Sequence, residues 1–221
     1  MNVQQQKNNN NEKIIMCVDV EVFQHQPKWT TIGILISKWP CGSILDTFET
    51  GCMRGNNTVS ADKIEFWNKH QKAYTYNCKL CKNKKVYEEE ERISRFVSLW
   101  LKRYPNIYII SDNPSFDVSI LQNIYQTNAL RQQKSHDKPL PSITVRSGKY
   151  FQPICTWSTK RTIQLMSGIN FKHITRALYR DVSQMANDKT SNILHTPLYD
   201  CSKIVSEYFL ILDYLNYMVV Y

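Results

Sequence analysis

Five side chains in three distant segments of this 221-residue chain have the types and spacing to do chemistry together. Asp19 and Glu21 stand two apart in I-M-C-V-D-V-E, Asp117 ends S-D-N-P-S-F-D, and His195 and Asp200 bound H-T-P-L-Y-D. Carboxylates repel one another, so a fold that gathers four of them needs a cation. Oxygen ligands suit Mg²⁺ or Mn²⁺, and two such ions about 3.5–4 Å apart promote in-line attack on a phosphodiester. Because the histidine adds a proton acceptor that works near neutral pH, the set predicts a metal-dependent nuclease.

A buried strand is expected to carry the first two acids. The apolar run Lys13–Val20 predicts a strand that ends near Asp19, and alternate strand residues share a face, so Asp19 and Glu21 project together. Two further strands over Trp29–Ser37 and Ser43–Thr50 follow after short connections, which favours an antiparallel meander.

The third acid follows a second buried strand. Asn106–Ser111 has the short apolar pattern of a parallel strand, and a helix is predicted over Phe116–Tyr125, so Asp117 lies where open α/β sheets bind ligands. An N-cap role that serves only helix stability is the alternative for Asp117, although Asp112 and Asn113 can also cap this helix.

The last helix positions the remaining pair. Thr196 can cap it and Pro197 suits its first position, which places Asp200 one turn before Ile204 on the inward face. His195 then lies in the loop just before the helix, where a purely structural role is the alternative.

The other segments complete an α/β pattern without an internal repeat. We expect one domain over residues 13–221: a mixed sheet of about five strands, the first three antiparallel, flanked by helices. The remaining predicted elements are helices over Ser60–His70, Glu88–Tyr104 and Asn170–Leu178, a strand over Lys149–Thr156, and basic, irregular insertions near 71–87 and 128–148.

Charge favours an anionic partner. The net charge is +9 and the pI is about 9.1, so nucleic acid fits as the partner. No run of 18 apolar residues indicates a membrane span, and the Asn/Gln-rich segment 1–12 predicts a disordered tail. Basic residues that can contact phosphate are Lys149, Lys160, Arg161, Lys172, Arg176 and Arg180.

Seven cysteines without framework spacing indicate a reduced intracellular compartment, cytoplasm or nucleus. Cys78 and Cys81 form one C-x-x-C, for which His70, Cys52 or Cys41 can complete a zinc site. A plain surface loop is the alternative, because no second pair at zinc-finger spacing exists.

Together the motifs Asp19-Val20-Glu21, Asn113-Pro114-Ser115-Phe116-Asp117 and His195 to Asp200 resemble the three exonuclease motifs of the DEDDh 3′–5′ exonucleases. The resemblance implies a ribonuclease H-like fold and two Mg²⁺ or Mn²⁺ ions. It implies that Asp19 bridges both ions, that Glu21 and Asp200 complete the first site, and that Asp117 serves the second. It also implies that His195 takes a proton from the attacking water. Glu65-Phe66-Trp67 and Cys201 are also similar to phage exonuclease A and its relatives in large DNA viruses, which implies a viral protein in a host cell.

One segment departs from the family pattern. Many members continue D-x-E-T-G, whereas here Val22 and Phe23 follow Glu21. Val22, Phe23, Asn113 and Phe116 are the expected substrate-binding residues. Phe23 either stacks on the terminal base, worth roughly 1–3 kcal/mol, or belongs to the core.

The resulting hypothesis is a 3′–5′ exonuclease that acts on single-stranded DNA or RNA 3′ ends and releases nucleoside 5′-monophosphates. Two alternatives stay open: a non-catalytic nucleic-acid-binding module with the same fold, and an endonuclease of the ribonuclease H kind.

Overall fold

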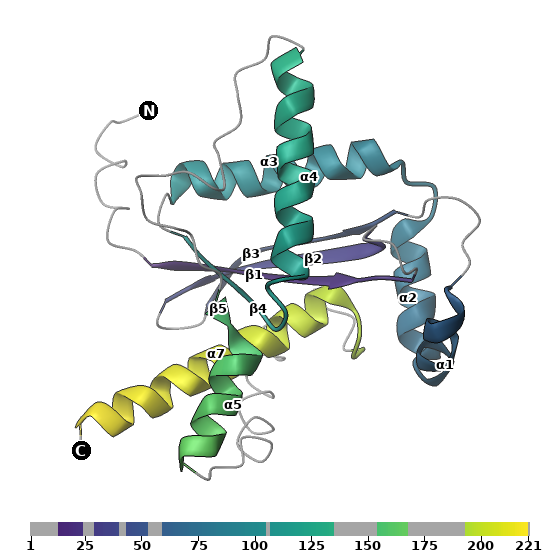
Figure 1. Cartoon of the computed structure of the whole chain (residues 1–221). Coiled ribbons are helices and arrows are strands. Elements are labelled where there is room, and N and C mark those ends of the chain that lie inside the picture. The colour runs from purple at the N-terminus through teal and green to yellow at the C-terminus, as the bar shows by residue number, and fades with distance from the viewer. Residues whose placement is uncertain are drawn as a thin grey trace.

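A five-stranded mixed sheet forms the centre of the protein (Figure 1). The structure, a computed structural model, describes residues 13–23, 29–39, 43–52, 59–104, 107–134, 154–167 and 193–220. The strand order is β3-β2-β1-β4-β5. β1 is antiparallel to β2, which is antiparallel to β3, whereas β4 runs parallel to β1 and to β5. This arrangement confirms the predicted mixed sheet with its first three strands antiparallel. The strands are β1 (Ile14–Glu21), β2 (Thr31–Lys38), β3 (Ile44–Gly51), β4 (Tyr108–Ser111) and β5 (Ile154–Cys155).

Helices cover both faces of the sheet. Figure 1 shows α3 and α4 on one face and α7 with α5 on the other. None of the helices in the described ranges combines the length and the apolarity needed to cross a bilayer. The helices are α1 (Ala61–Lys69), α2 (Gln71–Cys81), α3 (Val86–Arg103), α4 (Asp117–Lys134), α5 (Thr156–Ser167) and α7 (Pro197–Val220).

The alternation of side chains along β1 decides what its end presents. Ile14, Met16, Val18 and Val20 lie in the hydrophobic cluster that includes α3 and α4. Ile15 and Cys17 lie in the opposite cluster, with Leu198, Cys201, Ile204 and Val205 of α7. Because strand residues two apart share a face, the next two positions on the α7 side are those of Asp19 and Glu21. The core packing therefore directs both carboxylates toward the start of α7.

The prediction that the insertion near 71–87 is irregular is wrong. Residues 71–81 form α2, and 86–87 begin α3. Ala73, Asn77 and Cys81 are buried at i, i+4 and i+8, one face of a helix, while Lys72 and Lys79 are exposed. The helix was not predicted because most of its residues are polar or basic. Its buried face packs against β2 and β3.

Some other boundaries differ from the prediction. α4 continues to Lys134, so the first part of the expected loop 128–148 is helical, and α5 was not predicted. Of the strand expected over 149–156, residues 154–155 form β5. The expected helices near 60–70, 88–104 and from 197 onward are confirmed. The tail 1–12, the expected helix 170–178, and Lys149, Lys172, Arg176 and Arg180 lie outside the described residues.

Candidate active site

The end of β1 supplies two neighbouring carboxylates. Asp19 and Glu21 pair with Gly33 and Thr31 of β2. Each residue as a whole is partly exposed, although its carboxyl group lies among neighbouring atoms. Burial of the carboxyl group, followed by the charges of Glu21, Asp200 and Asp117, raises the pKa of Asp19 well above its usual range. Burial and then the charges of Asp200 and Asp117 likewise raise the pKa of Glu21. The negative charges of the other two motifs, on Asp117 and Asp200, thus raise the pKa of both acids.

Asp117 is held at the first turn of α4, at the carboxyl end of β4. Its side chain accepts a hydrogen bond from the Ser111 hydroxyl. Burial is the largest effect on this carboxyl group and raises its pKa to about 6, whereas Ser111 and the backbone amides of Asn113 and Val20 act to lower it. The effect of the Val20 amide places the Asp117 side chain near the end of β1 that carries Asp19.

The loop before α7 brings in the last two residues. The backbone amide of His195 donates to Asp200 Oδ2 over 3.0 Å, and His195 Nδ1 lies 4.0 Å from the same oxygen. Thr196, expected as a cap, uses its hydroxyl to bond the carbonyl of Ile193. Burial raises the pKa of Asp200 to about 7, against the lowering effects of Lys203 and of the His195 amide.

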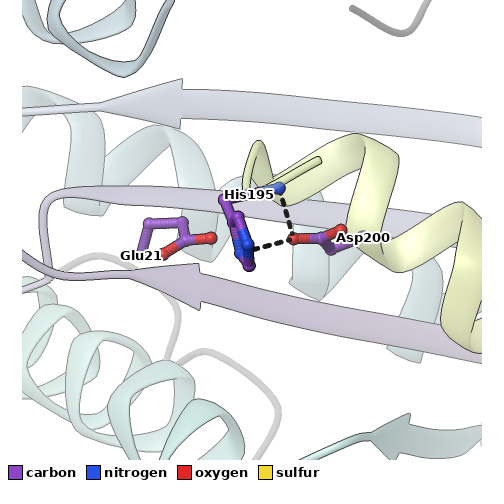
Figure 2. A group of neighbouring side chains, drawn as sticks. All are labelled: Glu21, His195 and Asp200. Carbon is purple, nitrogen blue, oxygen red and sulfur yellow. Dashed lines mark hydrogen bonds and ion pairs between the residues drawn. The ribbon is translucent and has the colours of Figure 1, made fainter. Parts of the chain in front are cut away.

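The first and third motifs meet in space. Figure 2 shows the imidazole of His195 between the carboxylates of Glu21 and Asp200. One ligand atom from each of these three residues lies within 4.8 Å of the others, and no other such group occurs in the described ranges. Asp19 and Asp117 are not part of this group of three, but the charge of Asp117 raises the pKa of Glu21, and the charges of Glu21 and Asp200 raise the pKa of Asp19. The structure therefore places the five predicted residues in one region, at the ends of β1 and β4 and the start of α7.

The donor set fits a hard divalent cation. Asp19 Oδ2 and Asp200 Oδ1 are buried, and neither accepts a hydrogen bond. Buried carboxylate oxygens without a donor are costly unless a cation neutralises them. Oxygen ligands of this kind suit Mg²⁺ or Mn²⁺.

A small cavity of about 240 Å³ adjoins Glu21. Val22 and Phe116, two of the expected substrate-binding residues, are part of its wall. Lys63 adds a positive charge, and its Nζ lies 3.4 Å from the carbonyl oxygen of Val22. The lining residues are Val20, Glu21, Val22, Lys63, Phe66, Trp67 and Phe116.

The other two expected substrate contacts lie elsewhere. Phe23 is 3% exposed and packs edge-on against Trp67, with ring centroids 4.8 Å apart. It is a core residue, so its expected stacking on a base is not supported. Asn113 lines a separate cavity of about 640 Å³ beside Trp157, and its backbone amide donates to the Ser111 hydroxyl.

The sequence analysis did not identify His70 and Phe66 as neighbours of His195. The ring centroids of His70 and His195 lie 4.2 Å apart. The ring centroid of Phe66 lies 4.6 Å from that of His70 and 4.8 Å from that of His195. Burial, followed by His70 and Lys203, lowers the pKa of His195 to about 4. No spacing rule links positions 66, 70 and 195, so only the fold reveals this ring group.

The zinc alternative receives no support in the described ranges. Cys78 and Cys81 lie on α2, where the Cys81 thiol donates to the carbonyl of Thr30. They form no group of three ligands there with His70 or Cys52. Cys41 lies outside the described residues.

A scan against protein-family models and a search of curated proteins found no match. Solved structures share the fold. One is the cell-death related nuclease 4 (CRN-4), at 13% identity and a TM-score of 0.52, covering 91% of this chain and 64% of that one. Another is a full-length 3′-exonuclease, at 15% identity and a TM-score of 0.50, covering 90% and 60%. A third is S. pombe Pop2p in its Mg²⁺- and Mn²⁺-bound form, at 12% identity and a TM-score of 0.50, covering 90% and 82%.

This chain spans less than two thirds of the first two of these structures. At such identities the likeness shows a common architecture: a five-stranded mixed sheet flanked by helices, the ribonuclease H-like fold of these nucleases.

Proposed function

We propose that this protein is a metal-dependent 3′–5′ exonuclease of the DEDDh type, which shortens single-stranded DNA or RNA and releases nucleoside 5′-monophosphates. One observation carries the proposal: Glu21, His195 and Asp200 each place a ligand atom within 4.8 Å of the others, and the charges of Asp19 and Asp117 act on the same region. The fold shared with a nuclease, a 3′-exonuclease and the Mg²⁺- and Mn²⁺-bound Pop2p adds support at the level of architecture.

Four carboxylates would hold two Mg²⁺ or Mn²⁺ ions. Asp19 would contribute to both, Glu21 and Asp200 to the first, and Asp117 to the second. The chemistry that such ions supply when bound is a water of lowered pKa and neutralisation of charge on the leaving 3′-oxygen. The two buried carboxylate oxygens without a donor, on Asp19 and Asp200, support this assignment.

His195 is the proposed general base. Its lowered pKa keeps the imidazole neutral at pH 7, so a ring nitrogen is available to accept the proton of the attacking water. The bond from its backbone amide to Asp200 fixes the residue beside a proposed metal ligand. The ring lies between the carboxylates of Glu21 and Asp200, two of the proposed metal ligands (Figure 2).

The cavity beside Glu21 is the proposed place of the terminal nucleotide. Val22, Phe66, Trp67 and Phe116 give it apolar walls on which a base can pack, and Lys63 gives it a charge that attracts phosphate. The net charge of +9 supports binding of a nucleic-acid strand at low salt. We propose one exonuclease domain over residues 13–221, acting in the cytoplasm or nucleus, or in the host cell if the protein is viral.

A time course on matched DNA and RNA oligonucleotides labelled at the 5′ end tests this function. With Mg²⁺ we expect a ladder that shortens from the 3′ end, and no shortening in EDTA. Asp19→Ala and His195→Ala should each lower the rate by about 10²–10⁴-fold, the usual contribution of such groups. Glu65→Ala, at an exposed acid of α1 paired with Lys69, is the matched control and should retain the normal rate.

A normal rate for either site variant would refute the assignment. The same assay separates the alternatives: a non-catalytic module would bind the oligonucleotide without Mg²⁺-dependent turnover. An endonuclease would cut a circular single strand that an exonuclease leaves intact.

A further inference from the structure

Asn77 on α2 connects a central strand to the loop of the proposed general base. Its side chain is fully buried. Asn77 Nδ2 donates to the backbone carbonyl of His195 over 2.9 Å, and Asn77 Oδ1 accepts from the Thr31 hydroxyl over 3.1 Å. Both ends of the amide are therefore used, and Thr31 is the β2 partner of Glu21. Asn77 links His195 to the strand that borders the carboxylates.

His195 needs such support because of its backbone conformation. Its φ is +65°, in the left-handed region that residues other than glycine rarely adopt. Such a conformation persists only where the surroundings hold it. The Asn77 amide holds the His195 carbonyl, and Asp200 holds the His195 amide, so both peptide groups of the residue are fixed.

A second connection from α2 reaches the first turn of α7. The Tyr76 hydroxyl donates to Glu49 Oε2 over 2.6 Å, and Glu49 Oε1 accepts from the backbone amide of Leu198 over 3.1 Å. Leu198 is the second residue of α7, and its amide is one of those that lack a partner within the helix. Glu49 therefore fixes the turn that carries Asp200.

We propose that α2 is a positioning element for the active site: Asn77 sets the placement of His195, and Tyr76, through Glu49, sets the first turn of α7. The catalytic part of this inference rests on the proposed function. Neither residue touches the reacting atoms, so each acts through another residue.

The substitution Asn77→Asp is the sharpest test. It preserves the shape and the acceptor for Thr31 but removes the donor to His195. We expect kcat to fall by about 100-fold, as for a misplaced catalytic group, with KM for the oligonucleotide unchanged. Asn128→Asp is the matched control: Asn128 is 3% exposed, and its Nδ2 donates to Ser94 Oγ between α4 and α3, away from the site. It should cost similar stability while kcat stays within about threefold of normal.

A double-mutant cycle shows whether Asn77 acts through His195. In a His195→Ala background, Asn77→Asp should lower kcat no further, because the group that it positions is gone. An equal loss in both backgrounds would overturn the proposal and indicate general damage to the site.

Hydrogen exchange followed by mass spectrometry tests, without an activity assay, whether Asn77 holds the loop of His195 in place. Asn77→Asp should accelerate exchange of the amides in 193–200 by about tenfold or more, the effect of losing one buried hydrogen bond, and Asn128→Asp should not. Unchanged exchange there would refute the positioning role. If the wild type lacks Mg²⁺-dependent hydrolysis, the proposed function fails, and this measurement still judges the structural claim.

Tyr76→Phe serves if Asn77→Asp does not fold. Its hydroxyl is only part-buried, so the loss of stability is smaller. We expect faster exchange at the start of α7 and a reduced kcat, whereas Glu49→Gln, which can still accept from Leu198 and bond Tyr76, should behave like the wild type. Equal behaviour of Tyr76→Phe and the wild type in both measurements would overturn the second connection.

Discussion

Replacing Asp200 by asparagine is expected to stabilise the metal-free protein while destroying its proposed activity. The side chain of Asp200 is 15% exposed, and burial raises its pKa from 3.8 to about 7. A folded-state pKa above the unfolded one means that the folded protein holds a proton which the unfolded chain has lost. Stability therefore falls as the pH rises from about 4 to about 7, and the full penalty applies at pH 8.

The size of the penalty follows from the shift. A difference of about 3 pKa units, at about 1.4 kcal/mol each, gives an upper figure of about 4 kcal/mol at pH 8. Asparagine has no charge to bury, and its Oδ1 can still accept from the His195 amide. For a chain of this length that gain corresponds to a melting temperature higher by roughly 10 °C in EDTA.

Thermal and urea unfolding in EDTA at pH 4 and pH 8 measure this effect. The gain of Asp200→Asn over the wild type should be nearly complete at pH 8 and largely lost at pH 4, where Asp200 is protonated in the folded protein and close to half protonated in the unfolded chain. Added Mg²⁺ should raise the melting temperature of the wild type more than that of the variant, because bound ligand stabilises only the folded state that binds it. Glu65→Gln on the exposed face of α1 is the control. A variant that is less stable than the wild type in EDTA at pH 8, or a gain equal at both pH values, would refute the reasoning.

Two further predictions concern packing near the site. Gly33→Ala should lower both stability, by about 1–3 kcal/mol, and kcat, because its Cβ would lie 2.5 Å from the carbonyl carbon of Pro197 and displace the start of α7. Phe23→Leu should lower the unfolding free energy by about 1 kcal/mol through looser packing on Trp67, with KM unchanged in steady-state assays. A rise in KM without loss of stability would restore Phe23 as a base-stacking residue.

Much of the fold is readable from local pattern. β1 and β2 are short apolar, β-branched runs that are buried on both faces, and α3 buries one amphipathic face, so the type of each element follows from its own residues. α2 and the end of α4 were missed because their apolar residues are few and surrounded by polar ones. Docking against neighbouring elements, rather than propensity, stabilises such helices.

The amino-acid sequence by itself indicated which residues could do chemistry together. Asp19, Glu21, Asp117, His195 and Asp200 are recognisable because carboxylates at strand and helix ends, with one histidine, have the types and spacing of a metal-dependent site. Their meeting point also follows in part from sequence, since alternation along β1 directs Asp19 and Glu21 to the face that packs on α7.

Only the tertiary structure decided what surrounds these five residues. Phe23 is a core residue because it packs against Trp67. The His70 ring lies beside the His195 ring, and the Asn77 side chain bonds the backbone carbonyl of His195. These contacts join positions 44, 125 and 118 residues apart. No local periodicity encodes such pairs; they exist because α1 and α2 pack against the same end of the sheet at which α7 begins.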